Sequence, residues 1–110
     1  MDIQFTARRF RARSEVKQRA IDAVKRLGKY YDGIVSADVI LSYERSFNSV
    51  KTAEINLRVH GITLSAKERA EEYEKSIDAA AEKLAGQLTK YKSKLHQKDK
   101  KKVRALKDKV

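Results

Sequence analysis

Residues 73–95 read YEKSIDAAAEKLAGQLTKYKSKL, and this stretch has the clearest helical pattern in the chain. Its apolar side chains recur every three or four residues, at Tyr73, Ile77, Ala80, Leu84, Leu88, Tyr91 and Leu95. This spacing places them on one stripe of an α-helix. We predict a helix from about Lys67 to Gln97, roughly 45 Å long at 1.5 Å per residue. Its apolar stripe must be buried against other elements of the fold.

Upstream of this helix, the sequence predicts one more helix and four strands. An amphipathic pattern indicates a helix over about Ser14–Tyr31, with Ser14 as its N-cap and Asp32-Gly33 after its end. Apolar and polar residues alternate in four segments, which is typical of half-buried strands. These segments are residues 2–6, 34–43, 50–59 and 62–66. We interpret Arg45–Ser49 as a loop and His60-Gly61 as a tight hairpin connection.

The predicted order of elements is β-α-β-β-β-α. A four-stranded sheet with both helices packed on one face buries all of these apolar faces, so we predict an α+β fold. The order contains the αβββα core of double-stranded-RNA-binding domains. At 110 residues the chain fits one domain, which we assign to residues 1–97. We expect residues 98–110, which are rich in lysine, to form a flexible basic tail.

The net charge of +11 is concentrated at the two ends of the chain. Residues 1–34 hold nine basic and four acidic residues, and residues 83–110 hold eleven basic and two acidic residues. Residues 35–82 are slightly acidic, with six basic and nine acidic residues. Two basic clusters favour a polyanionic ligand. The alternative is a charged surface that serves only solubility.

Several functional classes are disfavoured. Cysteine is absent, which excludes thiolate chemistry and fits a reducing cytoplasm. No apolar run resembles a signal peptide or a membrane span, so we expect a cytoplasmic protein with no membrane partner. His60 and His96 lie on different elements, and the glutamates at the start of the last helix suit the helix dipole. We therefore expect no enzyme activity, no metal or other cofactor, and no small-molecule substrate.

The basic residues of the two helices form a pattern. On the last helix, a second stripe precedes the apolar one by a single residue at each step, and its members are Lys83, Gln87, Lys90 and Lys94. It therefore lies about 100° from the buried stripe, where we predict that it faces the first helix. Basic residues of the first helix then complete a shared basic ridge, namely Arg19, Lys25, Arg26 and Lys29. A rigid ridge of this kind meets phosphates at fixed spacing.

RNA is the favoured polyanion. No DNA-recognition motif is visible. Double-stranded-RNA-binding domains carry a basic cluster at the start of their last helix, whereas this position is acidic here, with Glu68, Glu71, Glu72 and Glu74. A shaped RNA groove therefore fits better than a regular duplex. Tyr30 and Tyr43 are candidates for base stacking, although a place in the core or at its rim explains them more simply. Four further arginines, in the run Arg8–Arg13 after the first strand, have no assigned role.

The chain resembles the ribosome hibernation promoting factor family, which includes the ribosome-associated inhibitor of the cold-shock type. The resemblance covers nearly the whole length to about Gln97. Its most specific parts are Ser76-Ile77-Asp78, Lys83-Leu84-Ala85 and the stretch from Gln87 to Leu95. Supporting matches are Arg26-Leu27, Tyr30-Tyr31-Asp32, Asp38-Val39-Ile40-Leu41 and Ala53-Glu54-Ile55-Asn56-Leu57.

The resemblance implies a ribosomal partner. Members of this family bind the small ribosomal subunit, with its 16S-type rRNA, where mRNA and the A-site and P-site tRNAs would lie, and so silence whole ribosomes in stationary phase or stress. At matching positions it implies rRNA contacts by Arg26, Lys83, Gln87, Lys90, Lys92 and Lys94, and Lys25 and Lys29 lie close by. The chain looks like a short form, which in relatives works with a separate ribosome modulation factor. A general structured-RNA-binding or RNA-chaperone module is the alternative function.

Three positions depart from the family pattern. Gly86 stands where relatives often carry arginine, so one phosphate contact is missing. Glu72-Tyr73-Glu74 replaces an Asp-Met-Tyr run. The tail from Lys98 to Val110 is basic, whereas the cold-shock inhibitor type has an acidic tail.

Overall fold

The computed structural model describes the backbone of residues 1–44 and 50–108 and the side chains of that chain as far as residue 95. The predicted order of six elements is confirmed. The elements are β1 (Asp2–Ala7), α1 (Ser14–Leu27), β2 (Ile34–Glu44), β3 (Val50–Val59), β4 (Ile62–Ala70) and α2 (Tyr73–Asp108). The predicted loop Arg45–Ser49 lies outside the described residues.

The four strands form one mixed sheet in the order β1-β2-β3-β4. β1 pairs with β2 in parallel, whereas β2–β3 and β3–β4 pair antiparallel. The register aligns Phe5, Val39, Ile55 and Ala66 across the sheet. Because side chains alternate between the two faces of a strand, this register collects the apolar residues of all four strands on one face.

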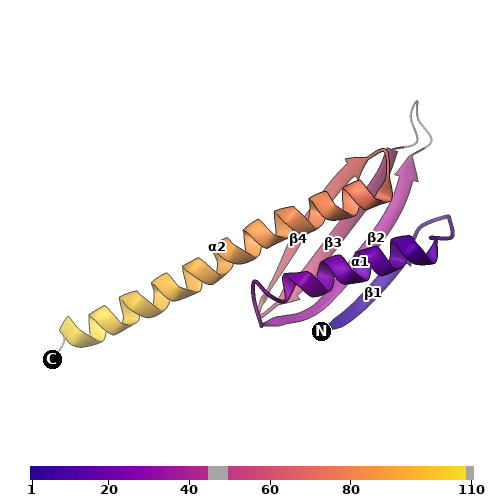
Figure 1. The fold of residues 1–110 in the computed structure, drawn as a ribbon. Helices are drawn as coiled ribbons and strands as arrows, with labels where there is room; N and C mark the ends of the chain where they lie inside the picture. The colour runs from indigo at the N-terminus through magenta and orange to yellow at the C-terminus, as the bar shows by residue number, and fades with distance from the viewer. Residues whose placement is uncertain (45–49, 109–110) are drawn as a thin grey trace.

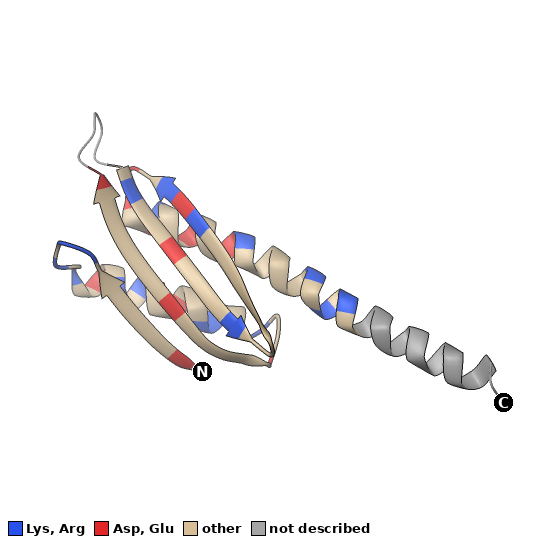
Figure 2. Cartoon of the chain, turned by 180° about the vertical axis from the view of Figure 1, so that it is seen from behind, with Lys and Arg blue, Asp and Glu red and all other residues tan. Residues whose placement is uncertain are grey.

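Both helices cover that apolar face, as predicted (Figure 1), and no described helix covers the other face (Figure 2). The core between helices and sheet contains the fully buried side chains Val24, Leu41, Ile55, Leu57, Ile77, Leu84 and Leu88. Helix α2 continues beyond the strands, so its C-terminal part projects away from the sheet (Figure 1). No helix in the described part of the chain has the length and apolarity that crossing a membrane requires.

The ends of α1 differ from the prediction. Ser14 is the first helical residue, and Arg13 is the N-cap, with no side-chain capping bond. The reason is that the amide of Lys17 donates to the carbonyl of Arg13 at 3.1 Å, which makes Arg13 the first intrahelical acceptor. The helix ends at Leu27 rather than Tyr31, because the amides of residues 28–30 bond three residues back and tighten the last turn.

The bounds of α2 also differ from the prediction. It begins at Tyr73, because β4 continues to Ala70 and pairs along its whole length with β3, as far as Lys51↔Ala70. Glu68 therefore lies on a strand, and only Glu74 occupies the first turn of the helix. At the other end α2 continues past the predicted limit of Gln97 to Asp108. The side chains of 96–108 and all of 109–110 lie outside the described residues, so the flexibility expected of 98–110 stays a prediction.

Candidate nucleic-acid interface

The end of α1 and the middle of α2 are held together by two tyrosines. The rings of Tyr31 and Tyr91 meet edge to face, with centroids 5.3 Å apart at 84°. The hydroxyl of Tyr91 also donates to the carbonyl of His60 in the β3–β4 turn at 3.4 Å. Burial, followed by the neighbouring Tyr91, raises the pKa of Tyr31 above its ordinary value. A Cβ on Gly33 would lie 2.5 Å from the Tyr31 ring, so glycine is required for this close approach.

This aromatic contact brings two groups of predicted RNA-binding residues to one end of the fold, and we call the set the basic end. Lys25 and Arg26 occupy the last turn of α1, and Lys29 follows it. On α2, Lys90 and Lys92 flank Tyr91, and Lys94 follows. The basic end therefore consists of six residues: Lys25, Arg26, Lys29, Lys90, Lys92 and Lys94. All six side chains are exposed, and none forms an ion pair within the described part of the chain. Their charges are therefore available to an external anion.

Two other predicted residues, Lys83 and Gln87, are engaged with strand β4. The ammonium of Lys83 pairs with the half-buried carboxylate of Glu68. The amide of Gln87 donates from Nε2 to the carbonyl of Ser65 at 3.0 Å. Both residues thus tie α2 to the sheet in the free protein, and Gln87 covers a backbone acceptor of an edge strand.

The predicted shared ridge between the helices is wrong. The residues of α2 that precede its buried stripe face β4, as Lys83 and Gln87 show, and those that follow the stripe face α1. The α1–α2 seam contains a groove of about 260 Å³ that is lined by Arg26, Asp78, Glu82 and small apolar residues. Arg19 does not belong to a basic surface either, because its guanidinium binds Asp78 at 2.6 Å. This hydrogen bond, and the charge of Asp78, raise the pKa of Arg19. The seam is therefore of mixed charge.

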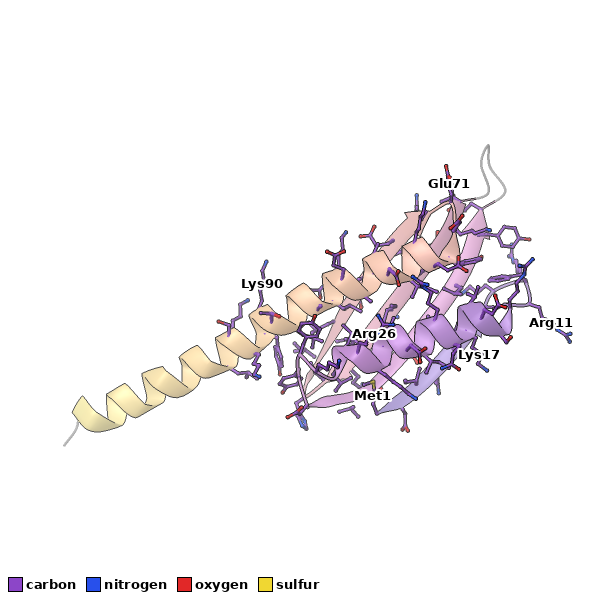
Figure 3. The ribbon with its side chains drawn as sticks, viewed as in Figure 1. Met1, Arg11, Lys17, Arg26, Glu71 and Lys90 are labelled. Carbon is purple, nitrogen blue, oxygen red and sulfur yellow. The ribbon has the colours of Figure 1, made fainter. Side chains whose placement is uncertain are left out.

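Figure 3 shows how two cations of the basic end lie relative to the sheet and the helices. Lys90 extends away from the sheet into solvent, whereas Arg26 lies on the side of α1 that faces α2 (Figure 3). The open face of the sheet carries acidic positions on β1, β2 and β3 and basic positions on β3 and β4 (Figure 2). Asp38 and Glu54 lie there, because they alternate with the buried residues Val39 and Ile55. Arg58, Lys67 and Arg69 share this face with the carboxylates, so the open face is of mixed charge.

The two predicted candidates for base stacking, Tyr30 and Tyr43, differ in their exposure. Tyr30 is 47% exposed next to the basic end and is free to stack on a base. Tyr43 is partly buried and packs edge-on against Phe10, with centroids 5.9 Å apart. The contact between Tyr31 and Tyr91 was not predicted, because nothing in the local sequence pairs residues so far apart. Their places at the ends of two apolar stripes were the only available signal.

The described residues contain no group of three or more His, Cys, Asp or Glu side chains that could hold a metal ion. His60 lies in the β3–β4 turn as predicted and is exposed. The side chain of His96 lies outside the described residues.

The fold and the basic end together define a small α+β protein with a cationic surface at one end. The chain belongs to the family of the sigma 54 modulation protein / S30EA ribosomal protein, whose family model matches residues 3–96. The resemblance drawn from the sequence is thereby confirmed.

Solved structures share the fold. A ribosomal subunit interface protein from Coxiella burnetii superposes with a TM-score of 0.76 at 24% identity, over 84% of this chain and 99% of that chain. The N-terminal domain of Protein Y from Thermus thermophilus gives a TM-score of 0.73 at 24% identity, over 83% of this chain and 99% of that chain. At this level of identity the likeness supports the fold alone.

Proposed function

We propose that the protein is a ribosome hibernation factor. In this proposal it binds the small ribosomal subunit in the channel of mRNA and of the A-site and P-site tRNAs, blocks translation, and preserves idle ribosomes in stationary phase or stress. The family membership supports a ribosomal partner. The observation that carries the proposal is the basic end, where six exposed cations from two helices have no ion-pair partner among the described residues.

The proposed mechanism is occupancy without chemistry. The tyrosine contact between α1 and α2 fixes the relative positions of the cations before the RNA arrives. Little backbone freedom is then lost on binding, which favours affinity. Lysine and arginine contacts to phosphate oxygens position the protein, and each contact displaces counterions from the RNA. Lys90, Lys92 and Lys94 lie next to or shortly after Tyr91, whose hydroxyl contacts the β3–β4 turn at the end of the sheet. From there α2 projects away from the sheet, and a narrow RNA channel can admit a single helix more readily than the whole domain (Figure 1).

Lys83 and Gln87 stay predicted contacts in this scheme. Both are already bonded to β4 in the free protein. Lys83 must share its ammonium between Glu68 and a phosphate, which reduces its net contribution. We therefore assign most of the binding energy to the basic end. Cytoplasmic localisation follows from a ribosomal partner, and a separate ribosome modulation factor is proposed as a second partner.

Cosedimentation tests the proposal. The purified protein is centrifuged with small subunits, large subunits and whole ribosomes, each with and without initiator tRNA and mRNA. We expect saturable binding to the small subunit that is lost when tRNA and mRNA occupy it. Equal binding to both subunits and to an unrelated structured RNA would instead establish the general RNA-binding function. Retained binding in the presence of tRNA and mRNA would move the site away from the channel.

A further inference from the structure

The loop between β1 and α1 carries four arginines that the proposed function does not use. These are Arg8, Arg9, Arg11 and Arg13, and all four are exposed. None of them forms an ion pair within the described residues. The loop appears as an almost continuous blue segment at the N-terminal end of α1, whereas the basic end lies at its C-terminal end (Figure 2). Arg11 points outward into solvent (Figure 3).

The backbone of this loop is fixed at three points. The amide of Arg8 donates to the carbonyl of Leu41 at 2.9 Å, and the carbonyl of Arg13 accepts from Lys17 at 3.1 Å. Between these bonds, the ring of Phe10 stacks on Tyr73 with centroids 5.1 Å apart and planes 5° apart. The loop backbone that carries the arginines is therefore ordered before a ligand binds. This order reduces the conformational entropy that the loop loses on binding.

One residue of the loop has a strained backbone. Arg9 has a φ of 64°, in the left-handed region that glycine and asparagine occupy more readily. Strain of this kind persists where the surrounding structure enforces it, and it is concentrated at functional sites. The chain thus places a long cation where glycine would be unstrained.

The surface chemistry selects RNA over other polyanions. Phe10 is turned into the aromatic contact with Tyr73, and the large apolar residues that are exposed in the described part of the chain (Met1, Tyr30, Val35 and Ile62) lie outside this loop. Protein interfaces need an apolar core, and membrane surfaces need an apolar face beside the cations. Interfaces with nucleic acids are polar and strongly positive, and the arginine fork matches a phosphate with two parallel hydrogen bonds.

We propose that the Arg8–Arg13 loop is a second RNA-binding site, which contacts a different backbone segment from the one held by the basic end. The inference rests on the proposed function for the identity of the RNA. Helix α1 has 14 residues and separates the two sites by about 20 Å at 1.5 Å per residue. Acidic groups lie between them, including Asp22 and the Asp78 that neutralises Arg19. A protein with two separated cationic sites selects RNA whose backbone segments have that spacing, which is recognition by shape.

The first experiment compares two triple variants with the same loss of charge. The loop variant is Arg8→Gln, Arg9→Gln and Arg11→Gln, and it keeps Arg13 so that the helix N-cap residue is unchanged. The matched control removes three exposed cations that belong to neither site, Lys67→Gln, Arg69→Gln and Lys75→Gln. Affinity for purified 16S-type rRNA is measured as a function of salt, and the urea midpoint of each variant verifies the fold. We expect the loop variant to lower the slope of log K against log salt by about 2–3, and the control by less than 1. Equal slopes for the two variants overturn the second site.

The second experiment locates the contacts on small subunits. The chain has no cysteine, so a single cysteine can carry a thiol-linked photo-crosslinker. Ala12→Cys reports the loop, Ser93→Cys reports the basic end, and Asp38→Cys on the open sheet face is the negative control. Cross-links from residues 12 and 93 to different rRNA segments, with none from residue 38, support the proposal.

Other outcomes separate the two proposals. Cross-links from residue 12 to ribosomal protein alone assign the loop to a protein partner and overturn the inference. If wild-type protein does not bind small subunits at all, the proposed function fails. The slopes on purified rRNA then still decide whether the loop binds RNA.

Discussion

Two sets of lysines on the same helix should behave differently when their charges are removed. Lys90, Lys92 and Lys94 are exposed and have no ion-pair partner among the described residues, whereas Lys83 pairs with Glu68. We predict that replacing the three exposed lysines by glutamine weakens binding to the small subunit and reduces its dependence on salt. Lys83→Met should mainly lower the free energy of unfolding.

The magnitudes follow from the number of contacts. Each phosphate contact contributes about 0.9 to the slope of log K against log salt, so three contacts contribute about 2.7. Between 50 and 200 mM salt, the wild-type protein should therefore lose about 40-fold more affinity than the triple variant. Lys83→Met should change the slope by less than about 0.9, because the ammonium is already shared. It leaves the half-buried carboxylate of Glu68 without its partner, which costs about 1 kcal/mol of stability.

Two measurements check that the three exposed lysines contribute to binding and Lys83 to stability. Cosedimentation or fluorescence anisotropy at four or more salt concentrations gives the slope for each variant, and urea unfolding gives the stability. The triple variant should retain the wild-type urea midpoint, because its side chains are exposed. An unchanged slope in the triple variant, or a slope that falls as far in Lys83→Met, would refute the assignment of binding energy to the basic end.

Three further substitutions or pairs of substitutions test the fold itself. A Cβ on Gly86 meets no atom within 4 Å, so Gly86→Ala should raise the free energy of unfolding by about 0.8–1 kcal/mol in a urea titration, and a loss of stability would contradict the open space seen there. Gly61 has a φ of 76° in the β3–β4 turn, so Gly61→Ala should lower the free energy of unfolding by about 1–2 kcal/mol, and a neutral result would show that the turn relaxes. Burial raises the pKa of Tyr31 and of Tyr73, in each case followed by a smaller contribution from a neighbouring tyrosine. Because the unfolded state then loses these protons first, the stability that they contribute is complete below about pH 10 and is lost as the pH rises further. The double variant Tyr31→Phe, Tyr73→Phe should lose less stability between pH 9 and 11 than the wild type, and parallel curves would count against the raised pKa values.

Much of the fold could be predicted because its signals are local. The apolar stripe from Tyr73 to Leu88 and the alternation of Val39 and Leu41 reflect helical and strand periods, and both sets are buried as expected. The end of β4 was harder to predict. Residues 67–70 are Lys, Glu, Arg and Ala, which favour a helix by intrinsic propensity. Pairing with β3 overrides that preference, because the ladder satisfies their backbone groups.

In the candidate site, too, some features follow from local sequence and others depend on tertiary packing. The amino-acid pattern is sufficient to predict cations in the last turn of α1 and along α2, because charge and spacing along one helix are properties of the chain. Which element each cation of α2 faces depends on the packing of the helix in three dimensions. A residue that precedes the apolar stripe is 100° from it in any helix, but whether β4 or α1 lies on that side depends on how the helix is placed across the sheet. Lys83 therefore forms an ion pair with Glu68 of the sheet, and Arg19 forms one with Asp78 across the seam between the helices. The contact between Tyr31 and Tyr91 holds the two helices together beside the basic end, whose cations are exposed.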